Sequence, residues 1–341
     1  MQRREFVKQT GVYSGSFFIA NGLLATDKGP IYGHGNMRYR MDAGWGKLNP
    51  QKHPVNDCHE MVQDSRGRIV LLTNETKNNV LIYNKSGRLL NSWGHDFPGG
   101  HGLSIQKNSK EDFLFITDTN RHQVYKTTID GKLLMTINSP LETGKYTNNE
   151  QFVPTETTVM ENGEFYIADG YGLQYIMHYD ESGRLKNIFG GRGEDKQHLD
   201  NAHGITVDTR QTPHTLLITD RTRHCFKRFS MDGKLLEIIE LPGACVCRPV
   251  IKGKNLYAAV LRSPDLGAEG TGFVTILDEQ NKVVSNIGGT APAYKNNVLQ
   301  PLRQAEKILI HPHDVLVDND ENIYVAQWAS GKVYPYKFKK V

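Results

Sequence analysis

The sequence predicts an all-β protein, a six-bladed β-propeller with four antiparallel strands in each blade. Three observations predict this fold: a repeated unit occurs six times, hairpin-type turns separate the β-type runs within the copies, and helical periodicity is nearly absent. The 341 residues are enough for one large core, so we expect a single propeller domain over residues 30–341.

The repeated unit is clearest in two copies, FLFITDTNRHQVYKTTIDGKLLMTI from Phe113 and TLLITDRTRHCFKRFSMDGKLLEII from Thr215. Further copies begin at Arg68, Glu164, Asn255 and Asn322. In most copies Asp-Gly or Ser-Gly joins the second β-type run to the third, and Gly tolerates the positive φ of such hairpin turns. A further run ahead of each copy brings the count to four strands, the number in a propeller blade.

The last copy stops after its third strand, at Val341. The segment NMRYRMDAGWGKL, from Asn36, resembles the missing fourth strand, because Trp-Gly also ends the copy at Trp93-Gly94. We therefore expect the N-terminal strand to pair in the last blade and close the ring, which removes the exposed sheet edges.

The N-terminus and the composition bear on location and partners. QRREFVK, Gln2 to Lys8, resembles a twin-arginine export signal, so we assign residues 1–29 to it and expect a bacterial protein that is periplasmic or secreted. No 18-residue apolar run predicts a membrane span, and 41 basic against 37 acidic residues without a basic stripe do not indicate nucleic-acid binding. Export would permit disulfides, although free or metal-adjacent thiols remain open for Cys58, Cys225, Cys245 and Cys247.

Four of the six predicted blade heads carry a histidine, in CHEMVQD, GHGLSIQ, AHGITVD and HPHDVLVD. The residues are His59, His101, His203 and His313, while Thr155 and Cys247 head the other two blades. His311 is an alternative to His313, but the register favours His313. The first strand of each propeller blade lines the central channel, so these heads should meet on one narrow ring.

Such a ring of imidazoles has two interpretations. Three neutral imidazoles with an open position are typical of a catalytic zinc site, although imidazole also binds copper, iron and nickel. The simpler interpretation is that the histidines only cap polar groups of the channel. The recurrence of histidine at equivalent positions favours the metal site.

These residues resemble peptidyl-α-hydroxyglycine α-amidating lyase, a family within the broader group of NHL-repeat propellers. The segments GHGLSI, ADGY, AHG followed by TDR, and HPHD stand in the order and spacing of that family's motifs, over about Phe97 to Phe338. The resemblance implies zinc on His101, His203 and His313, with Tyr171 as the catalytic tyrosine and Arg221 as an active-site arginine. It also implies a structural calcium bound by Asp314 and the main-chain carbonyl of Leu103.

The sequence departs from the family at several positions. The family's first active-site arginine has no convincing match, and only Cys225 of its disulfide cysteines is in place. His59 and His311 could enlarge the site, and Arg248 could replace the missing carboxylate clamp.

The expected activity is a metal-dependent lyase that cleaves the C–N bond of a small polar α-hydroxy-amide, either a small molecule or peptide-derived. A nearby cation would lower the pKa of Tyr171, which could then transfer a proton. Arg221 could bind a substrate carboxylate or the oxygen of Tyr171. Two alternatives remain, because propellers host many functions. One is a hydrolase of lactones or sugars, which needs acidic ligands from Glu60, Glu156 and Asp314; the other is a non-catalytic NHL-type binding module.

Overall fold

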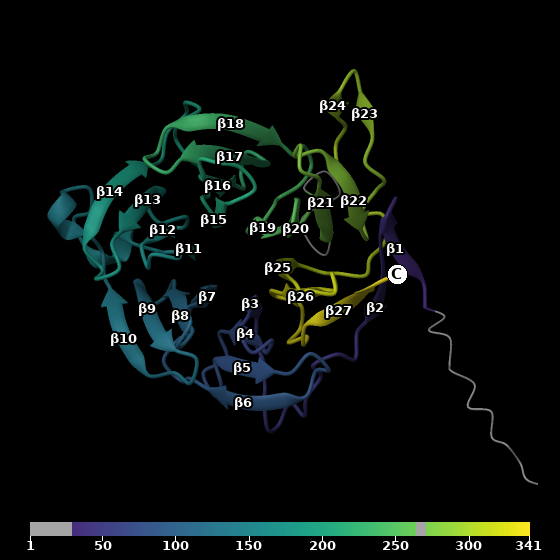
Figure 1. The fold of residues 1–341 in the computed structure, drawn as a ribbon, viewed down its shortest axis with the longest axis horizontal. Coiled ribbons are helices and arrows are strands. Elements are labelled where there is room, and N and C mark those ends of the chain that lie inside the picture. Colours follow the sequence, from purple (N-terminus) through teal and green to yellow (C-terminus); the bar gives the residue numbers. More distant parts are fainter. Residues whose placement is uncertain (1–28, 264–270) are drawn as a thin grey trace, which may run out of the picture.

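The computed structural model describes residues 29–263 and 271–341, which form six antiparallel sheets arranged in a ring (Figure 1). The first blade contains β3 (Cys58–Gln63), β4 (Ile69–Thr73), β5 (Val80–Tyr83) and β6 (Leu89–Trp93). The second contains β7 (Gly100–Gln106), β8 (Phe113–Asp118), β9 (Gln123–Thr128) and β10 (Leu133–Ile137). The third contains β11 (Glu156–Val159), β12 (Phe165–Ala168), β13 (Tyr175–Tyr179) and β14 (Leu185–Gly190).

The ring continues with two further regular blades. The fourth contains β15 (Ile205–Asp208), β16 (Thr215–Asp220), β17 (Cys225–Ser230) and β18 (Leu235–Glu240). The fifth contains β19 (Val250–Lys252), β20 (Asn255–Val260), β21 (Phe273–Leu277) and β22 (Val283–Ile287). A small hairpin of β23 (Tyr294–Lys295) and β24 (Val298–Leu299) projects from the ring after it, and two short 3-10 turns lie at Leu141–Thr143 and Asn149–Gln151.

The sixth blade joins the two ends of the described chain. It consists of β25 (Pro312–Val317), β26 (Ile323–Gln327) and β27 (Tyr336–Lys340), followed by β2 (Met37–Asp42) and β1 (Ile31–His34). Strand β2 runs antiparallel to β27, with Met41 opposite Phe338. The sequence placed one N-terminal strand in this blade, and the structure adds β1 outside it, so this sheet has five strands.

The core lies between neighbouring blades, because each sheet is apolar on both faces. Strands β4, β5 and β26 are buried at every residue, whereas the outer strand β6 is not buried at any. The interblade clusters mix residues of adjacent sheets, as where Leu72 of β4 packs with Leu103 of β7. Burial on both faces fixes the register of these strands, and the register determines where the first residue of each strand lies.

Three predictions from the sequence concern the export signal, membrane spans and the cysteines. The export signal assigned to residues 1–29 lies, apart from residue 29, outside the described residues and stays a prediction. Over the described part of the chain, no helix has the length and apolar character needed to cross a bilayer. All four cysteines, described in full, are buried free thiols.

Candidate metal centre

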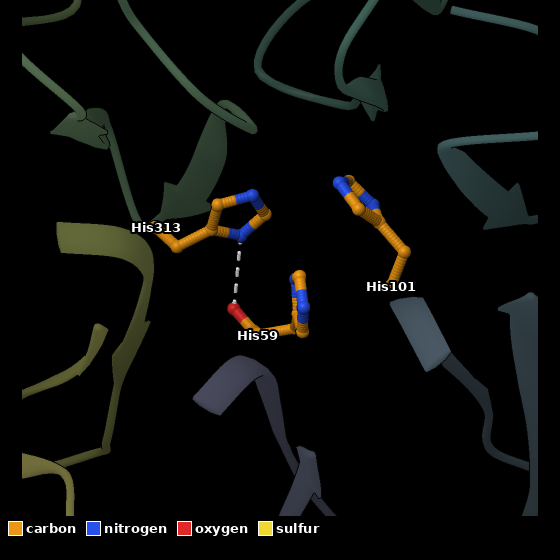
Figure 2. A group of neighbouring side chains, drawn as sticks. All are labelled: His59, His101 and His313. Atoms are coloured by element: carbon orange, nitrogen blue, oxygen red, sulfur yellow. Dashed lines mark hydrogen bonds between the residues drawn. The ribbon is translucent and has the colours of Figure 1, made fainter. Parts of the chain in front are cut away.

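Four histidine side chains meet where the inner strands of four blades begin. His59 comes from β3, His101 from β7 and His313 from β25, while His203 lies just before β15. All four are nearly inaccessible to solvent. Figure 2 shows three of them, with the imidazoles of His101 and His313 on either side of His59.

The rings are close enough to share one ion. His101, His203 and His313 come from alternate blades, and each pair of their ring centroids is 4.8 Å apart. Two imidazoles on a tetrahedral zinc, at Zn–N of about 2.0–2.1 Å, have centroids about 5 Å apart. His59 lies 4.9 Å from His101 and 4.8 Å from His313, measured in the same way.

The closest set of ligand nitrogens differs slightly from the set that the family resemblance implied. One nitrogen each of His59, His101 and His313 lies within 4.8 Å of the other two. His203, expected as a ligand, joins the cluster through its ring contacts with His101 and His313. The structure therefore brings together all three expected histidines and His59.

Local irregularities in the strands aim these side chains. The ladder register shifts between Cys58 and Glu60, between Gly100 and Leu103, and between Pro312 and Asp314, so each shift contains a histidine. Such β-bulges redirect a side chain and often occur next to active sites.

Glycine after the histidine has a steric reason in two of the blades. A Cβ at Gly102 would lie 2.5 Å from the carbonyl oxygen of Thr155, and a Cβ at Gly204 would lie 2.5 Å from the Cα of Arg248. The heads of neighbouring blades approach closely at these positions, which brings the histidines inward.

Main-chain carbonyls fix the tautomers of two imidazoles. Nδ1 of His101 lies 2.8 Å from the carbonyl oxygen of Thr155, and Nδ1 of His313 lies 3.2 Å from that of His59 (Figure 2). A carbonyl oxygen only accepts, so each Nδ1 carries the proton and each neutral ring keeps a lone pair on Nε2. This arrangement, with one nitrogen donating to the protein, is typical of histidine ligands of metals.

The other two imidazoles have buried nitrogens without hydrogen-bond partners among the described residues. They are Nδ1 of His59 and both ring nitrogens of His203. Unpaired buried polar atoms are costly, and a metal ion would satisfy one nitrogen of each ring. The donor set therefore fits a zinc ion, and the channel-capping interpretation does not explain these nitrogens.

Burial keeps the four imidazoles neutral, which is the form that binds a metal. It lowers the pKa of His59 to about 3. Burial also places the pKa values of His101, His203 and His313 well below the ordinary value, helped by neighbouring imidazoles and by Arg221.

Tyr171 and Arg221 lie beside the histidines, as the resemblance implied. The Tyr171 hydroxyl donates to Nε2 of His101 over 3.2 Å, although 42% of the tyrosine is exposed. In the protein without metal, burial of the hydroxyl raises the pKa of Tyr171 and outweighs the opposite effect of the Arg221 guanidinium. The hydroxyl is thus a proton donor at neutral pH. The expected lowering of this pKa by a bound cation stays a prediction.

Arg221 is not held by the aspartate before it. Asp220 pairs instead with Arg223 at 2.9 Å and Lys227 at 2.7 Å. Arg221 donates from Nη2 to Sγ of Cys247 over 3.1 Å and from Nε to the carbonyl of Val246 over 3.2 Å. The guanidinium therefore faces the cluster without a carboxylate partner among the described residues.

A pocket of about 220 Å³ opens onto this site and is lined by His59, His101, His313, Tyr171 and Arg221. Residues that the sequence analysis did not single out complete its wall: Asn74, Pro98, Gly99, Thr119, Asn120, Leu261 and Trp328. Most of them follow the end of the second strand of a blade, where no periodic pattern marks them. His311, the alternative to His313, packs against the Trp328 ring with centroids 5.9 Å apart and approaches the carbonyl of Ala329.

Two expectations about neighbouring residues do not fit. Arg248 cannot serve as a free substrate clamp, because its donors are taken by Asp314 and by main-chain carbonyls of Leu103 and Met61. The same contacts occupy the oxygen atoms expected to hold calcium, so the residues present do not fit that ion.

The fold and the site define a six-bladed propeller with a histidine cluster at one end of its axis. No family model matches the chain. The chain is 26% identical over 285 residues to peptidyl-alpha-hydroxyglycine alpha-amidating lyase 1 of Drosophila melanogaster. The match covers 74% of this chain and 47% of the relative. NHL repeat-containing protein 3 of Mus musculus is 26% identical over 179 residues, 50% of this chain and 51% of the relative.

The chain thus spans about half the length of these two curated relatives. Among solved structures, a streptogramin B lyase has a TM-score of 0.58 at 13% identity, covering 88% of this chain and 97% of that one. Virginiamycin B lyase from Staphylococcus aureus has a TM-score of 0.53 at 15% identity, covering 90% and 88%. The solved structures support the fold alone, and the curated relatives make this chain a distant relative of the amidating lyases and NHL-repeat proteins.

The buried imidazoles predict an acid-sensitive metal-free protein. The pKa of His59 is about 3 when folded and about 6.5 when unfolded. Its contribution to stability is therefore complete above pH 6.5 and is lost as the pH falls, at about 1.4 kcal/mol per pH unit. The free energy of unfolding of chelator-treated protein, measured with urea, should fall less steeply between pH 6.5 and 4.5 in His59→Gln than in the wild type. Equal slopes for His59→Gln, the wild type and the exposed control His214→Gln would contradict this assignment.

Proposed function

We propose that this chain is a metal-dependent lyase that cleaves the C–N bond of a small polar α-hydroxy-amide. The observation that carries the proposal is the set of converging buried imidazoles with unpaired nitrogens, in contact with Tyr171 and near Arg221. The Drosophila melanogaster relative supports the reaction class, since it is named as an amidating lyase.

The histidines would hold the metal, with His101 and His313 presenting Nε2 and His59 and His203 offering unpaired nitrogens. A metal on Nε2 of His101 would take the lone pair that now accepts from the Tyr171 hydroxyl, and would free that hydroxyl for the substrate. Zinc bound there would supply a Lewis acid that lowers the pKa of a substrate hydroxyl. Imidazole neutrality at physiological pH follows from burial and needs no further partner.

Tyr171 and Arg221 have separate roles in the proposed reaction. The Tyr171 hydroxyl lines the pocket beside His101, where it can give a proton to the departing amide nitrogen. Arg221 carries a buried positive charge without a carboxylate partner among the described residues, so it would attract a substrate carboxylate into the pocket. Together they favour a substrate that has a hydroxyl and a carboxylate on neighbouring carbons.

The hydrolase alternative is less well supported. The acids that it needs, Glu60, Glu156 and Asp314, are buried around Arg248 rather than lining the histidine pocket. In the binding-module alternative the histidines hold a structural ion or none. It predicts normal folding and partner binding after His→Ala changes, with no activity to lose.

We expect about one zinc per chain in protein purified without added metal. His101→Ala should lower the content at least tenfold, because it removes a ligand whose other nitrogen is already held by Thr155. His214→Ala, at an exposed histidine, should leave the metal content unchanged. Elemental analysis of the three proteins checks this. Absence of metal from the wild type would contradict the lyase proposal and leave the binding module as the remaining alternative.

Tyr171→Phe should lower the rate of glyoxylate release from a peptidyl α-hydroxyglycine by about 10²–10⁴-fold, because it removes a proton donor. The metal content should be retained, since the hydroxyl contacts a ligand without being one in the proposed set. Tyr294→Phe, in the outlying hairpin, is the matched control. If fully metal-loaded wild-type protein releases no glyoxylate, the amidating reaction must be abandoned.

A further inference from the structure

A buried guanidinium lies next to the histidine cluster and joins strands of four blades. Arg248, just before β19, donates from Nε and Nη2 to the two carboxylate oxygens of Asp314 over 3.1 and 2.8 Å. It also donates to the main-chain carbonyls of Leu103 over 3.0 Å and Met61 over 3.2 Å. Each of these partners comes one or two residues after one of the metal-centre histidines.

Two further carboxylates complete the surroundings of Arg248. Glu60 Oε2 lies 3.6 Å from Nη1, and Glu156 Oε2 lies 3.7 Å from Nε. All three acids are fully buried. They are also tied to the inner strands: Glu60 accepts from the Leu103 amide, Asp314 from the Met61 amide and Glu156 from the Thr157 amide.

Three carboxylates and two main-chain carbonyls are the oxygen ligands that a hard cation such as calcium prefers. In this chain the guanidinium itself makes the bonds to Asp314, Leu103 and Met61. A single positive charge thus sits inside a ring of oxygen atoms, at the place where the sequence analysis expected calcium.

We propose that Arg248 is the built-in cation of this oxygen site and takes the place of a bound divalent ion. It is a positioning residue: by joining the segments that follow His59, His101 and His313, it holds the three histidine-bearing strands around the axis. The proposal does not depend on whether the histidines hold a metal.

The cluster also separates two cavities on the axis. The histidine pocket lies on one side, and a larger cavity of about 560 Å³, lined by Arg248 and by later residues of the inner strands, lies on the other. The guanidinium is therefore placed in the middle of the channel, out of reach as a substrate group in the histidine pocket, which Arg248 does not line.

Removing the guanidinium should create the calcium site that it replaces. We expect Arg248→Ala to lower the Tm by roughly 5–10 °C, because three buried carboxylates lose their cation. Millimolar CaCl₂ should then recover much of that loss and bind at one ion per chain, whereas MgCl₂ should do so far less because magnesium demands a tighter octahedral shell. Differential scanning calorimetry and equilibrium dialysis with calcium measure both effects.

Controls make each outcome decisive. Arg228 is another buried arginine, which pairs with Asp208 and Glu237, and Arg228→Ala should be destabilised without a calcium response because Arg210 still neutralises Asp208. Arg248→Lys keeps the charge and should lose less stability, also without a calcium response. If Arg248→Ala does not fold alone, its refolding yield with and without CaCl₂ replaces the Tm.

Three results would overturn the proposal. The first is a calcium-dependent Tm in the wild type, which would show a calcium site beside the intact guanidinium. The second is a Tm of Arg248→Ala, or a refolding yield if that replaces it, that does not change with calcium. The third is an equal calcium response in Arg228→Ala.

Discussion

The convergence of inner strands around one axis is the constraint on which the site depends. Side chains that are more than 250 residues apart in sequence, such as His59 and His313, approach to 4.8 Å between ring centroids because their blades are neighbours in a closed ring. Pairing of β2 with β27 makes the first and last parts of the described chain one sheet, and the bulges at the strand heads turn the imidazoles toward each other. Burial then keeps these imidazoles neutral and ready to bind a metal.

The sequence predicted much of this arrangement because propeller blades repeat. The six copies of the unit, most with an Asp-Gly or Ser-Gly turn, predicted the blade count, and histidine at four of the six blade heads predicted the shared ring. The preference for His313 over His311 followed from the same register, and the structure agrees. Regular repetition was therefore sufficient for the fold and for four of the site's side chains.

The features that sequence analysis did not predict depend on where a long side chain points and on the balance of opposing energies. Neither is encoded in the periodicity of the sequence. Arg248 was assigned to a substrate because a long side chain near a blade head could point either way, and only the fold shows its bonds to Asp314, Leu103 and Met61. In the protein without metal, desolvation outweighs the Arg221 guanidinium and raises the pKa of Tyr171, a balance that no motif contains. Trp328 and Asn120 lie in segments after strands, where a pocket wall leaves no pattern.

The proposed function depends on chelation of one ion by the imidazoles of His59, His101, His203 and His313. A crystal structure of zinc-loaded protein, with anomalous data at the zinc edge, tests it most directly. The account predicts one anomalous peak on the axis, bonded at about 2.0–2.1 Å to nitrogens of at least three of the four clustered histidines. A peak bound elsewhere, or imidazoles that remain unbonded in crystals soaked with excess zinc, would contradict it.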